Sequence, residues 1–168
     1  MAQNAIAAAL ILAATASIAF AKTQARVAGQ KCPSINILTD ATRITQMAGE
    51  KIDLKAEIRD PALDCAIKAG TASSKLSFWV KSAIAPTSDI APRSVPYFVA
   101  VIANGEVIAK EIFDLKLNFT SDRMLKVKES VAKIEIPIAA GAEAQDYSIT
   151  IGFQLTEAQA AYNRTASR

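Results

Sequence analysis

The sequence predicts an all-β fold, namely an immunoglobulin-like antiparallel β-sandwich of seven or eight strands. Three observations predict it. Apolar and polar residues alternate along most of the chain, turn residues separate these segments at intervals typical of a sandwich, and no long segment before the C-terminus has helical periodicity. A small β-barrel is the alternative fold.

The alternation is clearest in two segments. From Ile52 to Arg59, apolar residues alternate with charged residues of alternating sign, and from Tyr147 to Leu155 apolar residues alternate with small and polar ones. One apolar face and one polar face are typical of a half-buried strand in an antiparallel sheet. Further strands are predicted at 76–80, 97–103, 113–119 and 125–138.

Turn residues divide these strands. Asn104-Gly105 favours the positive φ angles of a two-residue hairpin turn, and three prolines predict a loop from Ala85 to Pro96. The alternation changes phase near Ile112-Phe113 and again between Val131 and Ile134. We interpret both changes as bulges or bends.

The C-terminal part begins with Thr156 and Gln159, which have the spacing of a capping box. This motif predicts a short helix or turn that packs Tyr162 against the sheets. The tail 165–168 is predicted to fray.

The N-terminal 21 residues contain no Asp, Glu, Lys or Arg and end in Ala19-Phe20-Ala21. An apolar run followed by small residues before a cut predicts a secretory signal peptide over 1–21, cleaved near Ala21, and hence export to the periplasm. An uncleaved membrane anchor is the alternative, but the run is short against the ~20 residues needed to span a bilayer. We expect a flexible segment at 22–31 and a single domain at 32–164.

The chain contains two cysteines, Cys32 and Cys65. An even number in an exported chain predicts a structural disulfide, here closing a loop of about 34 residues. Two unconnected buried thiols are the alternative.

The charges are balanced and interspersed. The chain has 19 Lys and Arg and 16 Asp and Glu, a net charge of +3. The only short cluster of basic residues consists of Arg123, Lys126 and Lys128, and we interpret it as a solvated strand face. Binding of nucleic acid or of an anionic membrane is therefore not predicted.

The composition argues against catalysis. The chain has no His, which excludes every triad or zinc site that depends on imidazole, and a disulfide removes the thiol nucleophiles. There is no Gly-rich phosphate loop and no Asp-x-Asp calcium loop. We therefore predict no enzyme activity, no cofactor and no metal site, with a carboxylate-based hydrolase as a weaker class.

Several sequence motifs together resemble one group of proteins. These motifs are Cys32-Pro33 with Ile35, Cys65, the run from Val95 to Val101, and the segment from Gly152 to Arg164. They are similar to small exported, lipoprotein-like envelope proteins of alphaproteobacteria. The resemblance covers most of the chain after the signal peptide and implies a bacterial envelope location, but it implies no activity. No Cys stands at the cut, so the lipid anchor of the lipoprotein members is not expected here.

Two places are candidate partner-binding sites. Strand parity places Trp79, the only Trp, opposite Leu76, Phe78 and Val80, where it is either an exposed anchor or covered by the Pro-rich loop. Tyr162 and Arg164 form a polar and aromatic tip that either binds a partner or caps the sandwich. We therefore predict a non-catalytic periplasmic interaction module that binds a protein partner, as an accessory subunit of a bacterial cell-envelope assembly. The alternative is a periplasmic protein that binds a small ligand or a glycan.

Overall fold

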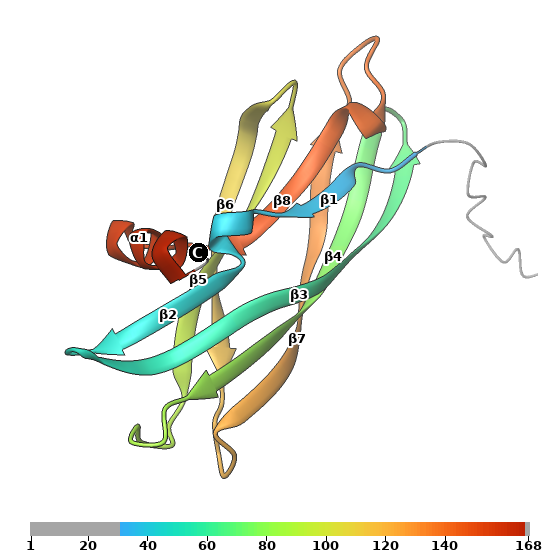
Figure 1. Cartoon of the computed structure of the whole chain (residues 1–168). Helices are drawn as coiled ribbons and strands as arrows, with labels where there is room; N and C mark the ends of the chain where they lie inside the picture. The colour runs from blue at the N-terminus through green and yellow to red at the C-terminus, as the bar shows by residue number, and fades with distance from the viewer. Residues whose placement is uncertain (1–30, 167–168) are drawn as a thin grey trace, which may run out of the picture.

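The computed structural model describes residues 31–166, which form two four-stranded sheets packed as a sandwich (Figure 1). The all-β sandwich is thus confirmed, and the sheets do not close into a barrel. In the first sheet the order is β1 (Ser34–Ile37), β8 (Tyr147–Phe153), β5 (Arg93–Ala103) and β6 (Glu106–Leu117). In the second it is β2 (Arg43–Ala48), β3 (Lys51–Lys68), β4 (Thr71–Ile84) and β7 (Met124–Pro137).

Two strands have no counterpart among the predicted segments. They are β1, which pairs in parallel with β8, and β2, which pairs antiparallel with β3. The four residues of β1 do alternate in burial, but so short a run does not by itself predict a strand. The 3-10 helix η1 (Thr39–Ala41) connects them, and a second one, η2 (Ala144–Asp146), precedes β8.

The predicted signal peptide at 1–21 lies outside the described residues, as does the predicted flexible segment at 22–31 apart from Lys31. Between residues 31 and 166, no helix is long and apolar enough to cross a bilayer.

The core lies between the two sheets and follows the predicted alternation. Along β3 the buried residues Leu54, Ala56 and Ile58 alternate with more exposed charged ones. Burial of these apolar faces is the main stabilising contribution to such a sandwich. The largest fully buried side chains are Tyr97, Phe78, Phe153, Ile44, Leu54, Ile58, Leu76, Leu117, Ile136, Ile149, Ile151 and Val80.

The predicted hairpin turn is confirmed, whereas the predicted loop is too long. Asn104 and Gly105 join β5 to β6 with φ angles of 53° and 80°. The loop was predicted to end at Pro96, but Pro96 lies in β5 opposite Asp114. The last residue pair between β5 and β8 is Tyr97 with Phe153, so Pro96 lies just outside this pairing. A proline, which has no N–H to donate, is tolerated at such a position.

One of the two predicted bulges is confirmed. The register of β4 with β7 shifts between the pairs Leu76–Val131 and Ser74–Ile134, and Lys133 in the bulge has a φ of 64°. The bulge predicted near Ile112-Phe113 is wrong, because β5 pairs regularly with β6 there. Ile112 breaks the alternation because it is an apolar residue on the solvent side, and the bulge of β6 lies at Ile108 instead.

Helix α1 (Glu157–Ala166) begins with the predicted capping box. The Thr156 amide donates to Gln159 Oε1 at 2.9 Å, and the Gln159 amide donates to Thr156 Oγ1 at 3.3 Å. The helix extends to Ala166, into the tail predicted to fray. The predicted packing of Tyr162 against the sheets is wrong, because Tyr162 is 41% exposed.

Side-chain amides attach α1 to the rest of the sandwich. Asn163 Nδ2 donates to the carbonyl oxygens of Asp40 and Arg43, at 3.0 and 2.8 Å, and Gln159 Nε2 donates to that of Thr45 at 3.2 Å. The helix is therefore attached to β2 and η1.

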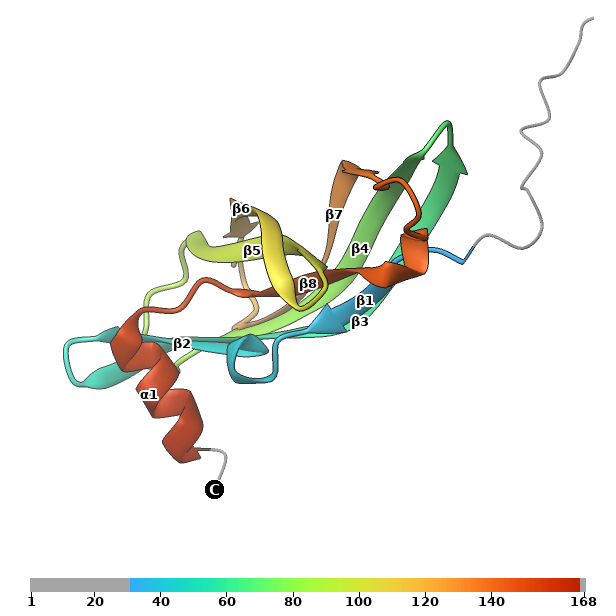
Figure 2. The same ribbon diagram turned by 90° about the horizontal axis from the view of Figure 1, so that it is seen from above.

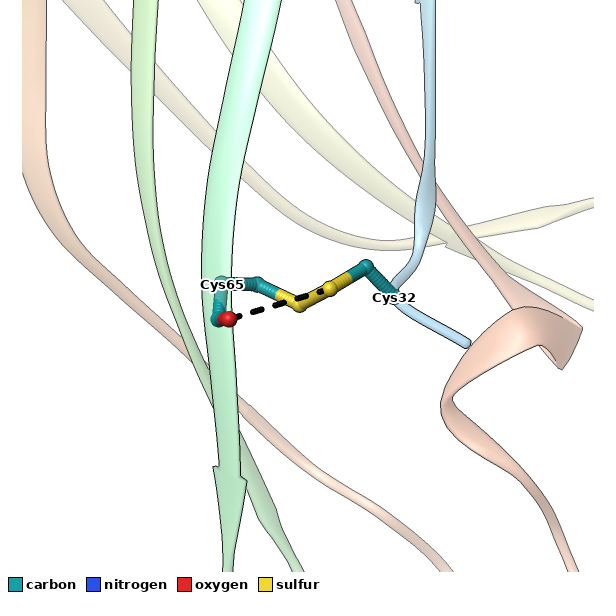
Figure 3. The surroundings of a disulfide bond; sticks show 2 residues. All are labelled: Cys32 and Cys65. Carbon is teal, nitrogen blue, oxygen red and sulfur yellow. Dashed lines mark hydrogen bonds between the residues drawn. A yellow bond between two sulfur atoms is a disulfide. The ribbon is translucent and has the colours of Figure 1, made fainter. Parts of the chain in front are cut away.

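The disulfide between Cys32 and Cys65 is present, with the Cα atoms 6.1 Å apart (Figure 3). Cys32 precedes β1 of the first sheet, and Cys65 belongs to β3 of the second. The bond therefore joins the two sheets covalently near one end of the sandwich.

An ion pair joins the sheets elsewhere. Arg93 in β5 donates from Nε and Nη2 to the two carboxylate oxygens of Asp53 in β3, at 3.0 and 3.3 Å. The hydrogen bond from Arg93, followed by that from Ser88, holds the pKa of Asp53 below its ordinary value.

This ion pair predicts a pH dependence. Because the pKa of Asp53 is lower in the folded state, its contribution to stability is present above about pH 4, the unfolded value, and is lost as pH falls through the folded pKa. We expect Asp53→Asn to lower the free energy of unfolding by about 1 kcal/mol at pH 7, since the pair is partly screened by solvent. The difference from the unmodified protein should shrink below about pH 4 in urea titrations at several pH values. Asp114→Asn, at an exposed position of β6, is the control, and an equal loss there would contradict the assignment.

Candidate functional site

Trp79 lies on the outward face of β4, as its parity predicts. Its neighbours Phe78 and Val80 are buried in the core, while Trp79 is half-buried on the opposite side of the sheet. Lys126 of β7 places its Nζ 4.3 Å from the centroid of the indole ring. The Trp79 ring therefore lies in a cation–π contact on the outside of the second sheet.

Basic residues surround Trp79 on this face. Its register partners are Arg59 in β3 and Lys128 in β7, and the next row along the strands contains Glu57, Lys81 and Lys126. We define the Trp79 face as the outward-facing residues of the second sheet around this position. It consists of Arg43, Lys55, Glu57, Arg59, Trp79, Lys81, Lys126 and Lys128.

The single carboxylate of the Trp79 face is fully engaged. Glu57 accepts from Arg43 Nε at 3.3 Å, and from Arg59 Nε and Nη2 at 3.1 and 2.8 Å. In the part of the chain that the structure describes, the four lysines of this face make no ion pair. Four uncompensated ammonium groups thus lie on one sheet face.

The prediction for the basic residues was partly wrong. Arg123, grouped with Lys126 and Lys128 by sequence, does not belong to the Trp79 face, because its Nη1 donates to the carbonyl oxygens of Ala85 and Ser88 at 2.7 Å each. It holds the loop that follows β4. Lys55 and Lys81, which are distant from this group in sequence, take its place because β3 and β4 bring them beside β7.

A groove of about 590 Å³ lies between the Trp79 face and α1. Its floor includes Arg43, Lys55 and Lys81, and Tyr162 and Asn163 of α1 line it on the other side. The structure thus brings Tyr162 to the same side of the sandwich as Trp79, which lies in the row next to Lys81. Arg164, the third predicted residue, is exposed and does not line the groove.

A second candidate surface is the edge strand β6, which forms the edge of the first sheet opposite β1 (Figure 1). Three large apolar side chains of β6 are more than half exposed: Val107 at 60%, Ile108 at 54% and Ile112 at 57%. Across residues 31–166, no strand pairs with the outer edge of β6. Its unpaired backbone groups and these side chains are therefore open to a partner.

The outward face of the first sheet is covered only in part. Phe98 and Ala100 of β5 are buried in a small cluster with Ala41 of η1. A Cβ at Gly152 would lie 2.8 Å from the Cβ of Ala41, which explains the glycine at this close approach. On the side toward β6, Lys110 places its Nζ 4.5 Å from the centroid of the Phe98 ring.

The loop end of the sandwich contains a larger hollow of about 790 Å³ near the disulfide. Its described lining residues include Ile67, Gly70, Ala139, Ala142 and Glu143, and none of them is aromatic. Pockets for small ligands are usually lined by aromatic and other apolar side chains, and this hollow has no aromatic side chain among its described lining residues.

A polar contact in the core concerns Tyr97, whose hydroxyl donates to Glu129 Oε1 at 3.1 Å. Burial, and then the negative charge of Glu129, raise the pKa of Tyr97, so this hydroxyl keeps its proton and the hydrogen bond persists.

Nowhere in 31–166 do three His, Cys, Asp or Glu side chains gather as metal ligands would.

Comparison with known proteins identifies no relative: no family model, no curated protein and no solved structure matches the chain. The function must therefore be inferred from the surfaces described above.

Proposed function

We propose that this protein is a non-catalytic interaction module of the bacterial cell envelope, and that it binds an extended segment of a partner protein along β6. The observation that carries the proposal is the exposure of Val107, Ile108 and Ile112 on a strand whose outer edge is unpaired. Strand addition would satisfy the free backbone groups of β6 and bury these side chains at the same time.

The energetics favour such a partner. Fully burying one large aliphatic side chain contributes about 1.5–3 kcal/mol. Because the three side chains are little more than half exposed, each can add roughly half of this, which is still a sizeable part of a binding free energy. Sheet edges in monomeric proteins are usually protected by charged side chains and bulges. β6 has such protection in Lys110 and in its bulge at Ile108, but the three apolar side chains remain exposed beside it.

The periplasm is the compartment we propose. The disulfide between Cys32 and Cys65 is consistent with an oxidising, exported environment, because such bonds rarely persist in a reducing cytoplasm. The uncharged N-terminal 21 residues and the resemblance to exported envelope proteins support the same compartment.

The test is site-specific photo-crosslinking in the native envelope, with the photoreactive group placed in turn at positions 108, 112 and 90. We expect one dominant product from positions 108 and 112. The control position is Ile90, an exposed apolar residue of the loop before β5, and we expect it to give none. Equal products from all three positions, or none from β6, would overturn the proposal.

A pair of variants extends the test. Val107→Lys with Ile112→Lys adds positive charge to the edge and should reduce the crosslink from position 108 about tenfold or more, because buried unpaired ammonium groups oppose docking. Ile90→Lys should leave it unchanged. Because all three residues are exposed, each variant should unfold at the same denaturant concentration as the unmodified protein.

A further inference from the structure

We propose a second binding site on the other sheet: the Trp79 face and the groove beside α1 bind a linear anionic glycan, one that bears carboxylate or phosphate groups along its chain. This site is independent of the β6 surface, because the two belong to different sheets.

Positive charge is concentrated on the Trp79 face. It has six cations against one carboxylate, whereas the whole chain has a net charge of only +3. Much of the positive excess of the protein is therefore gathered on one side of one sheet. Such a surface attracts polyanions.

The Trp79 face also tolerates repulsion between like charges. Lys81 and Lys126 are direct register partners on neighbouring strands, and like charges in this arrangement destabilise a sheet. Among residues 31–166 neither makes an ion pair, and Lys126 lies over the ring of Trp79 instead. A bound anion between them would relieve the repulsion.

The shape of the surface favours a chain over a membrane. Figure 2 shows α1 standing away from the sheet beside β2, and the groove between them is lined by Tyr162 and Asn163 on the helix side. A flat bilayer would meet the helix before it reached Lys55 and Lys81 on the floor. A narrow, extended ligand would fit into the groove and continue toward Trp79.

The chemistry of the floor favours a glycan over an acidic peptide. The backbone groups of a sheet interior are engaged in the ladder, so the floor offers side chains only, and a peptide backbone would find few partners there. Arg43, Lys55 and Lys81 are cationic donors, which suit carboxylate or phosphate groups spaced along a sugar chain. They outnumber the two carboxylates of the groove, Asp40 and Glu57, and Glu57 is already engaged by arginines. The 41% exposed Tyr162 offers aromatic surface for the apolar face of a sugar ring. Trp79, half-buried and in contact with Lys126, lies in the row next to Lys81.

The test uses the fluorescence of Trp79, which is the only tryptophan of the chain. We titrate the full protein with a short oligogalacturonate and expect a saturable change in emission. The affinity should fall as ionic strength rises, because the Debye length shrinks from about 30 Å at 0.01 M to about 8 Å at 0.15 M. A neutral dextran of equal length should cause no change.

The matched variants reverse two charges on each sheet. Lys81→Glu with Lys126→Glu should weaken oligogalacturonate binding about tenfold or more, since complementary charge is replaced by like charge. Lys110→Glu with Lys116→Glu makes the same change in net charge on β6 of the other sheet and should leave the affinity within about twofold. The midpoint of thermal unfolding of each variant shows whether the fold is retained. Because removal of Lys126 alters the Trp79 signal, calorimetry supplies a second measure of affinity.

Three results would overturn the proposal. They are no saturable binding of oligogalacturonate, equal weakening by both charge-reversed pairs, and tighter binding of another polyanion. The polyanions compared are polyglutamate, a single-stranded oligonucleotide and vesicles containing an anionic phospholipid. These experiments leave β6 unchanged apart from the control pair, so their failure would not count against the β6 proposal.

Discussion

Phe78→Ala is expected to lower the free energy of unfolding by about 3–5 kcal/mol, more than any surface substitution of this protein. Phe78 is 1% exposed and meets Tyr97 edge to face, with ring centroids 5.3 Å apart. Its removal would lose buried apolar area, an aromatic contact with the facing sheet and tight packing around the resulting cavity. Urea unfolding at pH 7 measures the loss.

The adjacent residue supplies the control for this prediction. Trp79→Ala removes a larger side chain, but on the outward face of the same strand, where the ring is half-buried. We expect a loss of only about 1–2 kcal/mol, from partial burial and the contact with Lys126. If the Trp79 variant were destabilised as much as the Phe78 variant, Trp79 would belong to the core and could not serve as a binding residue.

The second large effect concerns the disulfide. Replacing Cys32 and Cys65 together with Ser should lower the free energy of unfolding by about 3–4 kcal/mol, because the bond closes a long loop and so restricts the unfolded chain. The two residues are 33 positions apart and join the segment before β1 to β3. We therefore expect the urea midpoint of the double variant to fall.

Two further measurements bear on the disulfide. The intact mass of the native protein should be two hydrogens below the reduced value, as one disulfide requires. Ser74→Ala, a change of similar size at the register partner of Cys65, should cost far less than the double Cys variant. Free thiols in the denatured native protein, or equal losses for both variants, would contradict a stabilising role for the bond.

Much of the fold was predictable because it depends on patterns of residues that are close in sequence. The alternation in β3 and β8, the Asn104-Gly105 turn and the capping box from Thr156 to Gln159 each depend on residues close in sequence. The disulfide was predictable because the chain has only two cysteines. None of these predictions required knowledge of which strands are neighbours.

The candidate sites were predictable only in part, because they depend on neighbours distant in sequence. Parity placed Trp79 on the outward face, but only the register of β3, β4 and β7 assembles Arg59, Lys81 and Lys128 around it. Tyr162 was expected to pack on the sheets, because its aromatic character suggested burial. The side-chain amides of Gln159 and Asn163 hold α1 by hydrogen bonds and leave Tyr162 at the groove.

The exposure of β6 was missed for a related reason. Ile112 suggested a phase change, because an apolar residue on the solvent side is indistinguishable from a shift of register in sequence alone. In the structure β5 and β6 stay in register there, and the bulge lies four residues earlier at Ile108. The apparent break in the alternation at Ile112 therefore reflects an exposed apolar side chain and not a shift of register.

Amide hydrogen exchange of the isolated complex tests whether β6 receives a strand from a partner protein. Strand addition predicts slower exchange at backbone amides of β6 (Glu106–Leu117) on binding, with no change in β7 (Met124–Pro137), an edge strand of the second sheet. Slower exchange confined to β7 or α1, or unchanged exchange throughout β6, would contradict the claim.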